Sequence, residues 1–412
     1  MAIFIKQEKE TELKVSEKHV PLRIFGFLLA LVVAVGSIAF GVSRIGYKEE
    51  GMYELTAAAD QDLPRYANGV HAKFFFRGSS AQIKLAIGSA DKVYSQALKD
   101  AYRLLDAHNE YPGLVNLASL NARLNQDVQL SPALFDVLRD AWEKTRTAQG
   151  YSLFAGPLYA EWESVLILTE PQDFDPLRSE DTAARLEALR RETGDLSRFR
   201  LIVTDEENCV LRLEVDEDYL RFLEELELEP AVLDLNLLRE AYLLKLVAAE
   251  LEAQGLTEGY LSTDSGMLLS LSGQKGGEYC LYDYREGRPA LAAVAPVEAG
   301  SACCLWTAFP LTLGVETEFY TITEEKEHLR NPYLPADGTD RELLLSSCVI
   351  RSDGDPVQAG FESLRLRMAS DAEELERLSE ESDSAVAWLL QGDDSGTLGM
   401  NELAEGLFRP AE

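Results

Sequence analysis

The chain has 412 residues, 46% of them hydrophobic, and a formal net charge of −32. This length and composition are sufficient for at least one large domain with its own apolar core. Acidic residues (71) far outnumber basic ones (39), which argues against nucleic acids and anionic surfaces as partners, because little positive charge is available to displace phosphate counterions.

Near the N-terminus, residues 24–42 form an apolar run without a single charge, IFGFLLALVVAVGSIAFGV. One bilayer crossing takes about 20 such residues, so we predict a single-pass transmembrane anchor at 24–43. Basic residues precede it at five positions, the last of them Arg23, which favours a cytoplasmic tail at 1–23 and an extracytoplasmic remainder. A cleaved signal peptide stays open as the alternative, although no clear small-x-small cleavage site follows the run.

The chain outside the predicted membrane divides into a polar stalk at 44–70, one large domain at 71–390 and a loose tail at 391–412. Alternating apolar residues and turn signals predict strands in the first half of the domain at 71–76, 82–87, 201–204 and 209–215. Helix-period apolar faces predict helices at 90–108, 131–147 and 182–192. Ser131 and Pro132 are typical of a helix start, since serine caps the first turn and proline suits its first position.

The middle of the domain, residues 233–273, is predicted to carry the functional residues. Asp234 and Asn236 are candidate caps for a helix that Gly255 ends, and residues 259–269 are predicted to form one buried strand. This strand contains Thr-Asp-Ser-Gly, a sequence that can bring backbone and hydroxyl groups close to a ligand.

In the second half, strands are predicted at 278–284, 290–295, 302–309, 319–322, 342–351 and 385–390, with helices at 356–368 and 371–379. Because most strands follow one another in adjacent pairs, the predicted class is α+β with antiparallel sheet. The five cysteines have no metal-ligand spacing, and we expect no disulfide framework.

Several short motifs occur in a recognisable order. They are Asn121, then Gly156-Pro157-Leu158 with Trp162, then Asp234-Leu235 with Tyr242, then Thr307, then His328 with Pro332. This order resembles the bacterial FAD:protein FMN transferases (ApbE-type flavin transferases) over residues 71–390. The resemblance implies a T-fold-like α+β domain, FAD and Mg²⁺ as cofactors, and transfer of FMN to a threonine or serine of a partner protein. That partner is a flavinylated electron carrier or part of a redox membrane complex.

The resemblance also implies roles for individual residues. Those for flavin binding are Asp234, Tyr242, Gly156 and Thr307; those for the metal are the Leu237 carbonyl, Glu362 and Gln358; and His328 lies near the transfer centre. Each has a plainer interpretation: Asp234 as a helix cap, His328 as a solvated loop residue, and Glu362 as part of a helix surface.

The departures from the family pattern concern the chemistry. Glu240 stands where the family has a lysine, which reverses the charge beside a pyrophosphate. Gln358 and Glu362 stand where the family has an aspartate and a threonine that help hold magnesium. Two functions follow as hypotheses: a degenerate, flavin-binding or redox-assembly scaffold, or an active Mg²⁺-dependent FAD:protein FMN transferase. A third is an anchored ectodomain with a purely structural role.

Overall fold

A computed structural model describes residues 47–58, 69–147, 151–167, 171–176, 178–229, 231–311, 320–322, 328–330, 343–392 and 396–411. The predicted cytoplasmic tail and the anchor at 24–43 lie outside these residues. Within the described ranges, no helix combines the length and the apolar character that a bilayer crossing requires.

The described residues fall into two units. The small one comprises 47–50 and 77–84, where the Lys48 backbone N–H donates to Ser80 Oγ (2.9 Å) and Arg77 lies 3.4 Å from the Glu50 carboxylate. The main unit comprises 51–76 and the residues from 85 onward. It contains all the residues that the sequence singles out for function.

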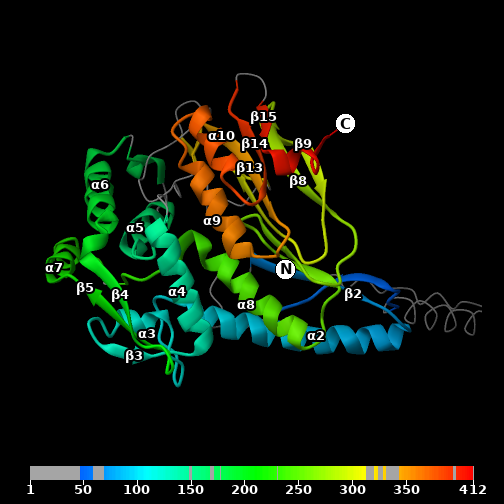
Figure 1. The fold of residues 1–412 in the computed structure, drawn as a ribbon, viewed down its shortest axis with the longest axis horizontal. Helices are drawn as coiled ribbons and strands as arrows, with labels where there is room; N and C mark the ends of the chain where they lie inside the picture. The colour runs from blue at the N-terminus through cyan, green and yellow to red at the C-terminus, as the bar shows by residue number, and fades with distance from the viewer. Residues whose placement is uncertain are drawn as a thin grey trace, which may run out of the picture. The chain divides into compact units, whose positions relative to one another are not determined.

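An eight-stranded sheet forms the centre of the main unit (Figure 1). Its strands, in spatial order, are β1 (Gly51–Glu54), β2 (Val70–Phe76), β6 (Gly259–Thr263), β7 (Met267–Ser270), β10 (Ala302–Thr307), β13 (Leu344–Arg351), β14 (Ala385–Leu390) and β15 (Thr397–Met400). All neighbouring pairs are antiparallel, which confirms the α+β class with antiparallel sheet.

Different elements cover the two faces of this sheet. Successive side chains of a strand point to opposite faces, so Cys303 and Cys304 mark one face each. Cys303 lies in an apolar core shared with β8 (Glu278–Arg285) and β9 (Arg288–Pro296), which form a second sheet with β16 (Arg409–Pro410) on the far side of β9. Cys304 contacts Ser363 of α9 (Pro356–Arg367), which packs with α8 (Arg239–Ala253) on the opposite face (Figure 1).

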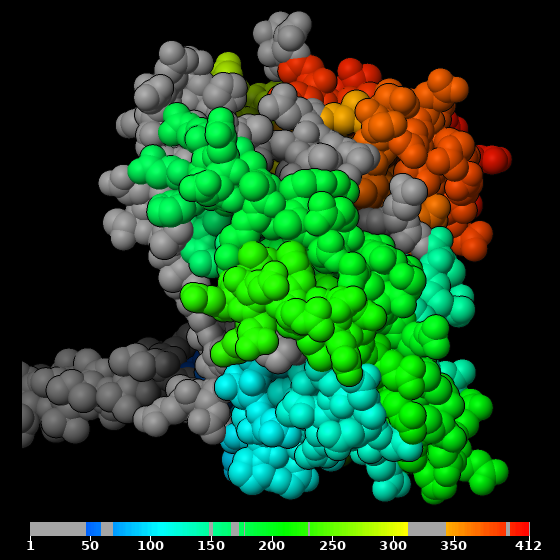
Figure 2. Space-filling view, turned by 90° about the vertical axis from the view of Figure 1, so that its left-hand side faces the viewer, coloured from blue at the N-terminus to red at the C-terminus, as the bar shows by residue number. Residues whose placement is uncertain are grey.

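A third sheet lies among helices earlier in the chain. It contains β3 (Asp127–Gln129), β5 (Val210–Val215) and β4 (Phe199–Asp205), accompanied by α4 (Pro132–Thr147), α5 (Gly156–Ile167), α6 (Glu180–Gly194) and α7 (Glu217–Glu225). Its core is aromatic: Phe154 stacks on Phe199 at 4.6 Å, and Tyr219 meets Phe199 edge-on at 4.8 Å. Figure 2 shows this face, where the green atoms lie above the cyan atoms and also extend down beside them on the right.

Shorter elements complete the described fold. They are α3 (Leu117–Asn121), α10 (Ala372–Glu380), α11 (Glu402–Glu405), the strand pair β11 (Tyr320–Ile322) and β12 (His328–Arg330), and the 3-10 turns η2 (Pro171–Phe174), η3 (Leu196–Arg198) and η4 (Asn236–Leu238). The long helix α2 (Ser80–Leu105) follows β2. The five cysteines are free thiols in the structure.

Two predicted strands are wrong. Residues 82–87 belong to α2, and Gln82 in its first turn accepts hydrogen bonds from the N–H and the hydroxyl of Ser79, the residue before the helix. Residues 259–269 form two strands, β6 and β7, because Gly266 turns the chain between them at φ +97°. This left-handed conformation suits glycine, and any Cβ there would lie 2.0 Å from the Leu305 carbonyl oxygen.

Two segments that were expected to be irregular contribute strands. Part of the predicted stalk at 44–70 forms β1 and pairs with β2, and the predicted tail at 391–412 contains β15 and β16. These strands of two to four residues are too short to show a strand period, and the neighbouring strands provide the backbone partners.

Candidate functional site

The first group of predicted site residues meets at the loop 231–236, and Asn121 fixes this loop. Asn121 Nδ2 donates to the carbonyl oxygens of Ala107 and Leu233, both at 3.0 Å, and its Oδ1 accepts the Leu233 N–H at 2.8 Å. A capping box at Asn116 and Ser119 starts the short helix α3 that ends on Asn121. One buried amide therefore joins segments more than a hundred residues apart in sequence.

Gly156 lies directly against the same loop. A Cβ at this position would be 2.2 Å from the Ala231 carbonyl oxygen and 3.3 Å from Asp234 Cβ, so only glycine fits without a shift of the backbone. The Asp234 N–H in turn donates to the Leu153 carbonyl at 3.0 Å. The structure thus brings Gly156 and Asp234 together, as a shared role requires.

The Asp234 carboxylate is buried and has two local partners. Its Oδ1 accepts the Asn236 N–H at 2.7 Å, and its Oδ2 lies 3.6 Å from Nε2 of His108. Burial alone would raise the pKa of Asp234, but His108, the charge of Arg239 and the Asn236 N–H outweigh it and lower the pKa. The contact with Asp234 raises the pKa of His108, against the opposing effect of its partial burial. The pair is therefore an aspartate with an imidazolium at moderately acidic pH.

The expected helix caps differ from those observed. Neither η4 nor α8 has a side-chain cap, because leucines (Leu235 and Leu238) occupy their N-cap positions. Asp234, one residue earlier, accepts the N–H of Asn236, the first residue of η4. His108 was missed by the sequence reasoning. Histidine is rare in this chain, with four residues, and this rarity is the only feature of the sequence that could have drawn attention to His108.

A cavity of about 330 Å³ opens beside this loop. Its lining comprises His108, Gly156, Pro157, Ala160, Glu227, Leu228, Glu229 and Ala231. The walls are mainly apolar, and the charged groups besides His108 are two carboxylates. This volume is at the lower end of ligand pockets, about 300–1,000 Å³. The carboxylates repel phosphate, so the cavity suits an uncharged group better than a pyrophosphate.

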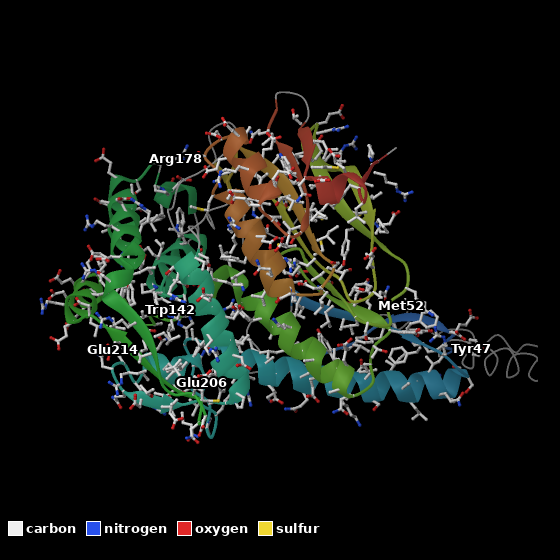
Figure 3. The ribbon with its side chains drawn as sticks, in the orientation of Figure 1. Tyr47, Met52, Trp142, Arg178, Glu206 and Glu214 are labelled. Atoms are coloured by element: carbon white, nitrogen blue, oxygen red, sulfur yellow. The ribbon has the colours of Figure 1, made fainter. Side chains whose placement is uncertain are left out.

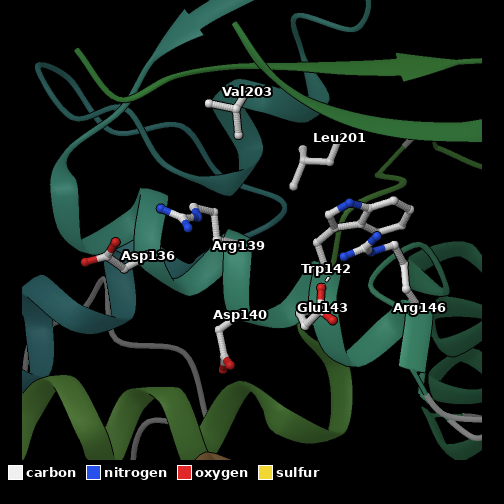
Figure 4. A pocket seen from close by; sticks show the side chains of 8 residues that line it. All are labelled: Asp136, Arg139, Asp140, Trp142, Glu143, Arg146, Leu201 and Val203. Atoms are coloured by element: carbon white, nitrogen blue, oxygen red, sulfur yellow. Dashed lines mark hydrogen bonds and ion pairs between the residues drawn. The ribbon is translucent and has the colours of Figure 1, made fainter. Parts of the chain in front are cut away.

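Tyr242 lies away from this cavity and joins α8 to α4. Its hydroxyl donates to Asp140 Oδ2 at 2.7 Å, and Lys144 Nζ lies 2.7 Å from the other carboxylate oxygen. Burial, with the charge of Asp140 adding to it, raises the pKa of Tyr242, so the phenol remains a hydrogen-bond donor. Asp140 also lines an open hollow of about 620 Å³ with Arg139, Trp142, Leu201 and Val203 (Figure 4).

This hollow is bordered by α4 and β4. The Arg139 guanidinium lies 3.0 Å from the carboxylate of Glu206, which belongs to the turn between β4 and β5 (Figure 3). Arg146 lies over the Trp142 ring at 5.6 Å. Arg139 and Arg146, which line the hollow, thus both contact other side chains of the protein.

Glu240 lies at the start of α8, at the position where the resemblance to the flavin transferases places a lysine. Its carboxylate accepts a hydrogen bond from Ser265 Oγ, which also contacts Thr263 Oγ1 at 2.8 Å. Thr263 Oγ1 in turn accepts the Met267 N–H at 3.1 Å. The hydroxyls of the Thr-Asp-Ser-Gly turn therefore bond to the chain itself and to a carboxylate.

The other predicted ligands lie on β10 and α9. Thr307, at the end of β10, donates its hydroxyl to the Phe309 carbonyl. Glu362 is buried, and its carboxylate accepts hydrogen bonds from Arg351 (3.2 Å), Gln358 (2.8 Å) and Ser382. Among the described residues, no three His, Cys, Asp or Glu side chains are grouped as metal ligands.

Leu237 belongs to η4, and α9 packs against this turn: a Cβ on Gly360 would be 3.1 Å from a Leu238 methyl group. The helix that carries Gln358 and Glu362 is therefore next to the turn that carries the Leu237 carbonyl. His328 begins β12, opposite Ile322 of β11, and its side chain lies outside what the structure describes. The structure does not test its predicted role.

Comparison with known proteins gives matches in structure. No protein-family model matches the sequence, and the search of curated proteins finds no match. The ApbE protein of Thermotoga maritima superposes with a TM-score of 0.58 at 12% identity, over 86% of this chain and 99% of that one. The flavin transferase ApbE of Vibrio cholerae gives 0.55 at 12% identity, over 87% and 99%. The flavinyl transferase ApbE of Pseudomonas stutzeri gives 0.52 at 15%, over 87% and 97%.

The chain is thus similar over most of its length to solved ApbE flavin transferases, and the predicted α+β flavin-transferase fold is confirmed. At these identities the similarity concerns the fold. Activity has to be argued from the site.

Proposed function

We propose that the chain is a membrane-anchored, extracytoplasmic scaffold that uses the flavin-transferase fold to bind a flavin or to organise a redox assembly, without transferring FMN itself. The structural neighbours from Vibrio cholerae and Pseudomonas stutzeri are flavin transferases, which supports a role related to flavin transfer.

The observation that carries the proposal is the Glu240–Ser265 contact at the start of α8. A pyrophosphate needs hydrogen-bond donors and positive charge around it. Here a carboxylate stands where the resemblance places a lysine, and it accepts the hydroxyl of Ser265. Glu227 and Glu229 add further negative charge at the neighbouring cavity.

The residues around Glu362 do not suit a magnesium ion. It prefers six oxygen ligands, one or two of them carboxylates. The Glu362 carboxylate is already bonded to Arg351, Gln358 and Ser382, and the described residues contain no group of three metal-binding side chains. Glu227 and Glu229 at the otherwise apolar cavity disfavour a pyrophosphate there, which supports the loss of FMN transfer.

The test is a labelling reaction with the detergent-solubilised full-length chain, FAD, Mg²⁺ and an acceptor protein with a flavinylation threonine. We expect no fluorescent acceptor after acid precipitation, while an active flavin transferase with the same acceptor gives a strong band. A labelled acceptor with this chain would refute the proposal. Quenching of FAD fluorescence on titration separates a flavin-binding scaffold from one that does not bind flavin.

The alternative is an active Mg²⁺-dependent FAD:protein FMN transferase that modifies a threonine or serine of its partner. The meeting of Asn121, Gly156 and Asp234 at one loop favours it, because these are the residues in which the chain matches the family motifs. On this hypothesis, Glu362→Ala abolishes labelling while the protein remains folded.

The proposed topology is tested separately. Alkaline phosphatase fused to the C-terminus is active only outside the cytoplasm, so we expect an active fusion in cells. An inactive phosphatase together with an active cytoplasmic reporter at the same position would contradict the proposed orientation.

A further inference from the structure

The Glu362 carboxylate lies in the interior, where α9 meets the end of β13. Its side chain is 6% exposed and that of Arg351 is 16% exposed. One oxygen accepts hydrogen bonds from Arg351 Nη1 at 3.2 Å and Gln358 Nε2 at 2.8 Å, and the other accepts one from Ser382 Oγ. Each oxygen of a buried carboxylate therefore has a partner, and one of these partners is a cation.

Arg351 is itself held in place by a second carboxylate. Its Nε donates to Asp353 Oδ1 at 3.0 Å, its Nη2 contacts the other oxygen of Asp353, and its Nη1 lies 3.4 Å from Ser384 Oγ. The hydrogen bond to Asp353, together with the charge of Glu362, raises the pKa of Arg351. The same contact lowers the pKa of Asp353. The guanidinium is therefore always charged and fixed between two carboxylates.

A buried carboxylate is stable only with a counter-charge and satisfied hydrogen bonds. A divalent cation at the carboxylate oxygen that faces Arg351 and Gln358 would have to displace these N–H donors, since a metal ion and an N–H group compete for the same lone pairs. Mg²⁺ also requires near-octahedral oxygen ligands at about 2.0–2.1 Å, and two of the three groups around Glu362 present nitrogen.

We infer that the Arg351 guanidinium is the permanent counter-charge of Glu362 and replaces a divalent cation at this position of α9. The inference depends on the proposed function only for the correspondence between Glu362 and the metal position of the transferases. It predicts that the stability of this region depends on an arginine and is indifferent to Mg²⁺.

The first experiment is thermal unfolding of the full-length chain in detergent, with MgCl₂ or with EDTA at matched ionic strength. For the wild type we expect the same Tm in MgCl₂ as in EDTA, and for Glu362→Gln we also expect no difference between the two solutions. A Mg²⁺-dependent rise in Tm that Glu362→Gln removes would overturn the inference. A rise that survives Glu362→Gln supports it, because the ion then binds without this carboxylate.

The second experiment is a mutant cycle. Arg351→Met leaves Glu362 buried without its counter-charge, and we expect Tm to fall by roughly 10 °C. Arg351→Met/Glu362→Met removes both charges and should recover a large part of this loss. Arg377→Met is the matched control, since this arginine pairs with Glu381 on an exposed face and its loss should shift Tm by about 1 °C at most.

Should Arg351→Met fail to fold, the double variant alone decides: a folded double variant supports the inference, and an unfolded one contradicts it. The results of these two unfolding experiments do not depend on the result of the flavin-labelling test. Covalent flavin on an acceptor, with no Mg²⁺ effect at Glu362, would refute the proposed scaffold and leave this inference intact.

Discussion

The loop 231–236 and the surroundings of Glu362 are stabilised in different ways. At the loop, Asn121 and Gly156 meet backbone groups, and the contacts depend on one amide and on the absence of a side chain. At Glu362, the contacts are between side chains, and a guanidinium faces a carboxylate. The first arrangement uses residues that match the flavin-transferase pattern, and the second uses residues that depart from it. The residues that support the fold, such as Asn121 and Gly156, can thus match the family pattern while residues at the predicted metal position, such as Glu362, depart from it.

The largest expected effect breaks the first arrangement. Asn121→Ala leaves the Leu233 N–H and two carbonyl oxygens without their partner, and each buried unsatisfied group costs about 1–3 kcal/mol. We expect a loss of about 3 kcal/mol or more in the free energy of unfolding, measured with urea. Asn208→Ala, in an exposed turn, should change it by no more than about 0.5 kcal/mol. Equal effects would show that the loop is not held by Asn121.

The next effect concerns the close approach of Gly156. Gly156→Ala places a methyl group 2.2 Å from the Ala231 carbonyl oxygen, which requires a backbone shift and should cost about 1–3 kcal/mol. Gly88→Ala is the matched control, because this glycine lies within α2 with nothing near its Cβ position. Alanine there should stabilise the helix by up to about 1 kcal/mol. A neutral Gly156→Ala would mean that the loop can move away freely.

A smaller effect tests the second arrangement. Ser382→Ala removes the hydroxyl donor to one oxygen of Glu362, and hydrogen bonds to charged groups contribute about 1.5–3 kcal/mol. We expect a loss near the lower end of this range, since Ser382 is only partly buried. Ser272→Ala removes an exposed serine–glutamate bond and should be almost neutral in the same urea titration. A neutral Ser382→Ala would show that solvent replaces the hydroxyl.

The smallest effect is the pH dependence at Asp234. The folded-state pKa of His108 is raised, so its contribution is complete below the ordinary value of about 6.5 and is lost as pH rises through the folded value. The pKa of Asp234 is lowered, so its contribution is lost only as pH falls below about 4.

The stability difference between wild type and His108→Gln should therefore be largest near pH 5 and shrink toward pH 8. Because the His108 side chain is 39% exposed, we expect it to stay below about 1 kcal/mol. In the Asp234→Asn background the pH dependence should become smaller, because only the weaker effects of Asp106 and Glu163 on the pKa of His108 remain. An unchanged pH dependence there would show that Asp234 is not the main partner of His108.

Some residues of the candidate site could be predicted from the sequence, and others could not. Gly156 and Asp234 were predicted together and meet, because a glycine needed for close approach and an acid before a helix leave a local signal. Tyr242 was assigned to flavin and bonds to Asp140 of α4, a partner about a hundred residues away that no local pattern indicates. His108 was missed for the same reason, since its partner Asp234 belongs to a distant loop.

The sequence alone determined which segments form most helices and strands, the antiparallel α+β class, and the order of motifs that resembles the flavin transferases. These depend on apolar periods, caps and turn residues that act within a few positions of the chain. Only the tertiary structure decided that the ends of the main unit add strands to its sheets, that Glu240 pairs with Ser265, and that Arg351 neutralises Glu362. Such contacts join segments distant in sequence, and a charge shows its partner only after folding brings the two together.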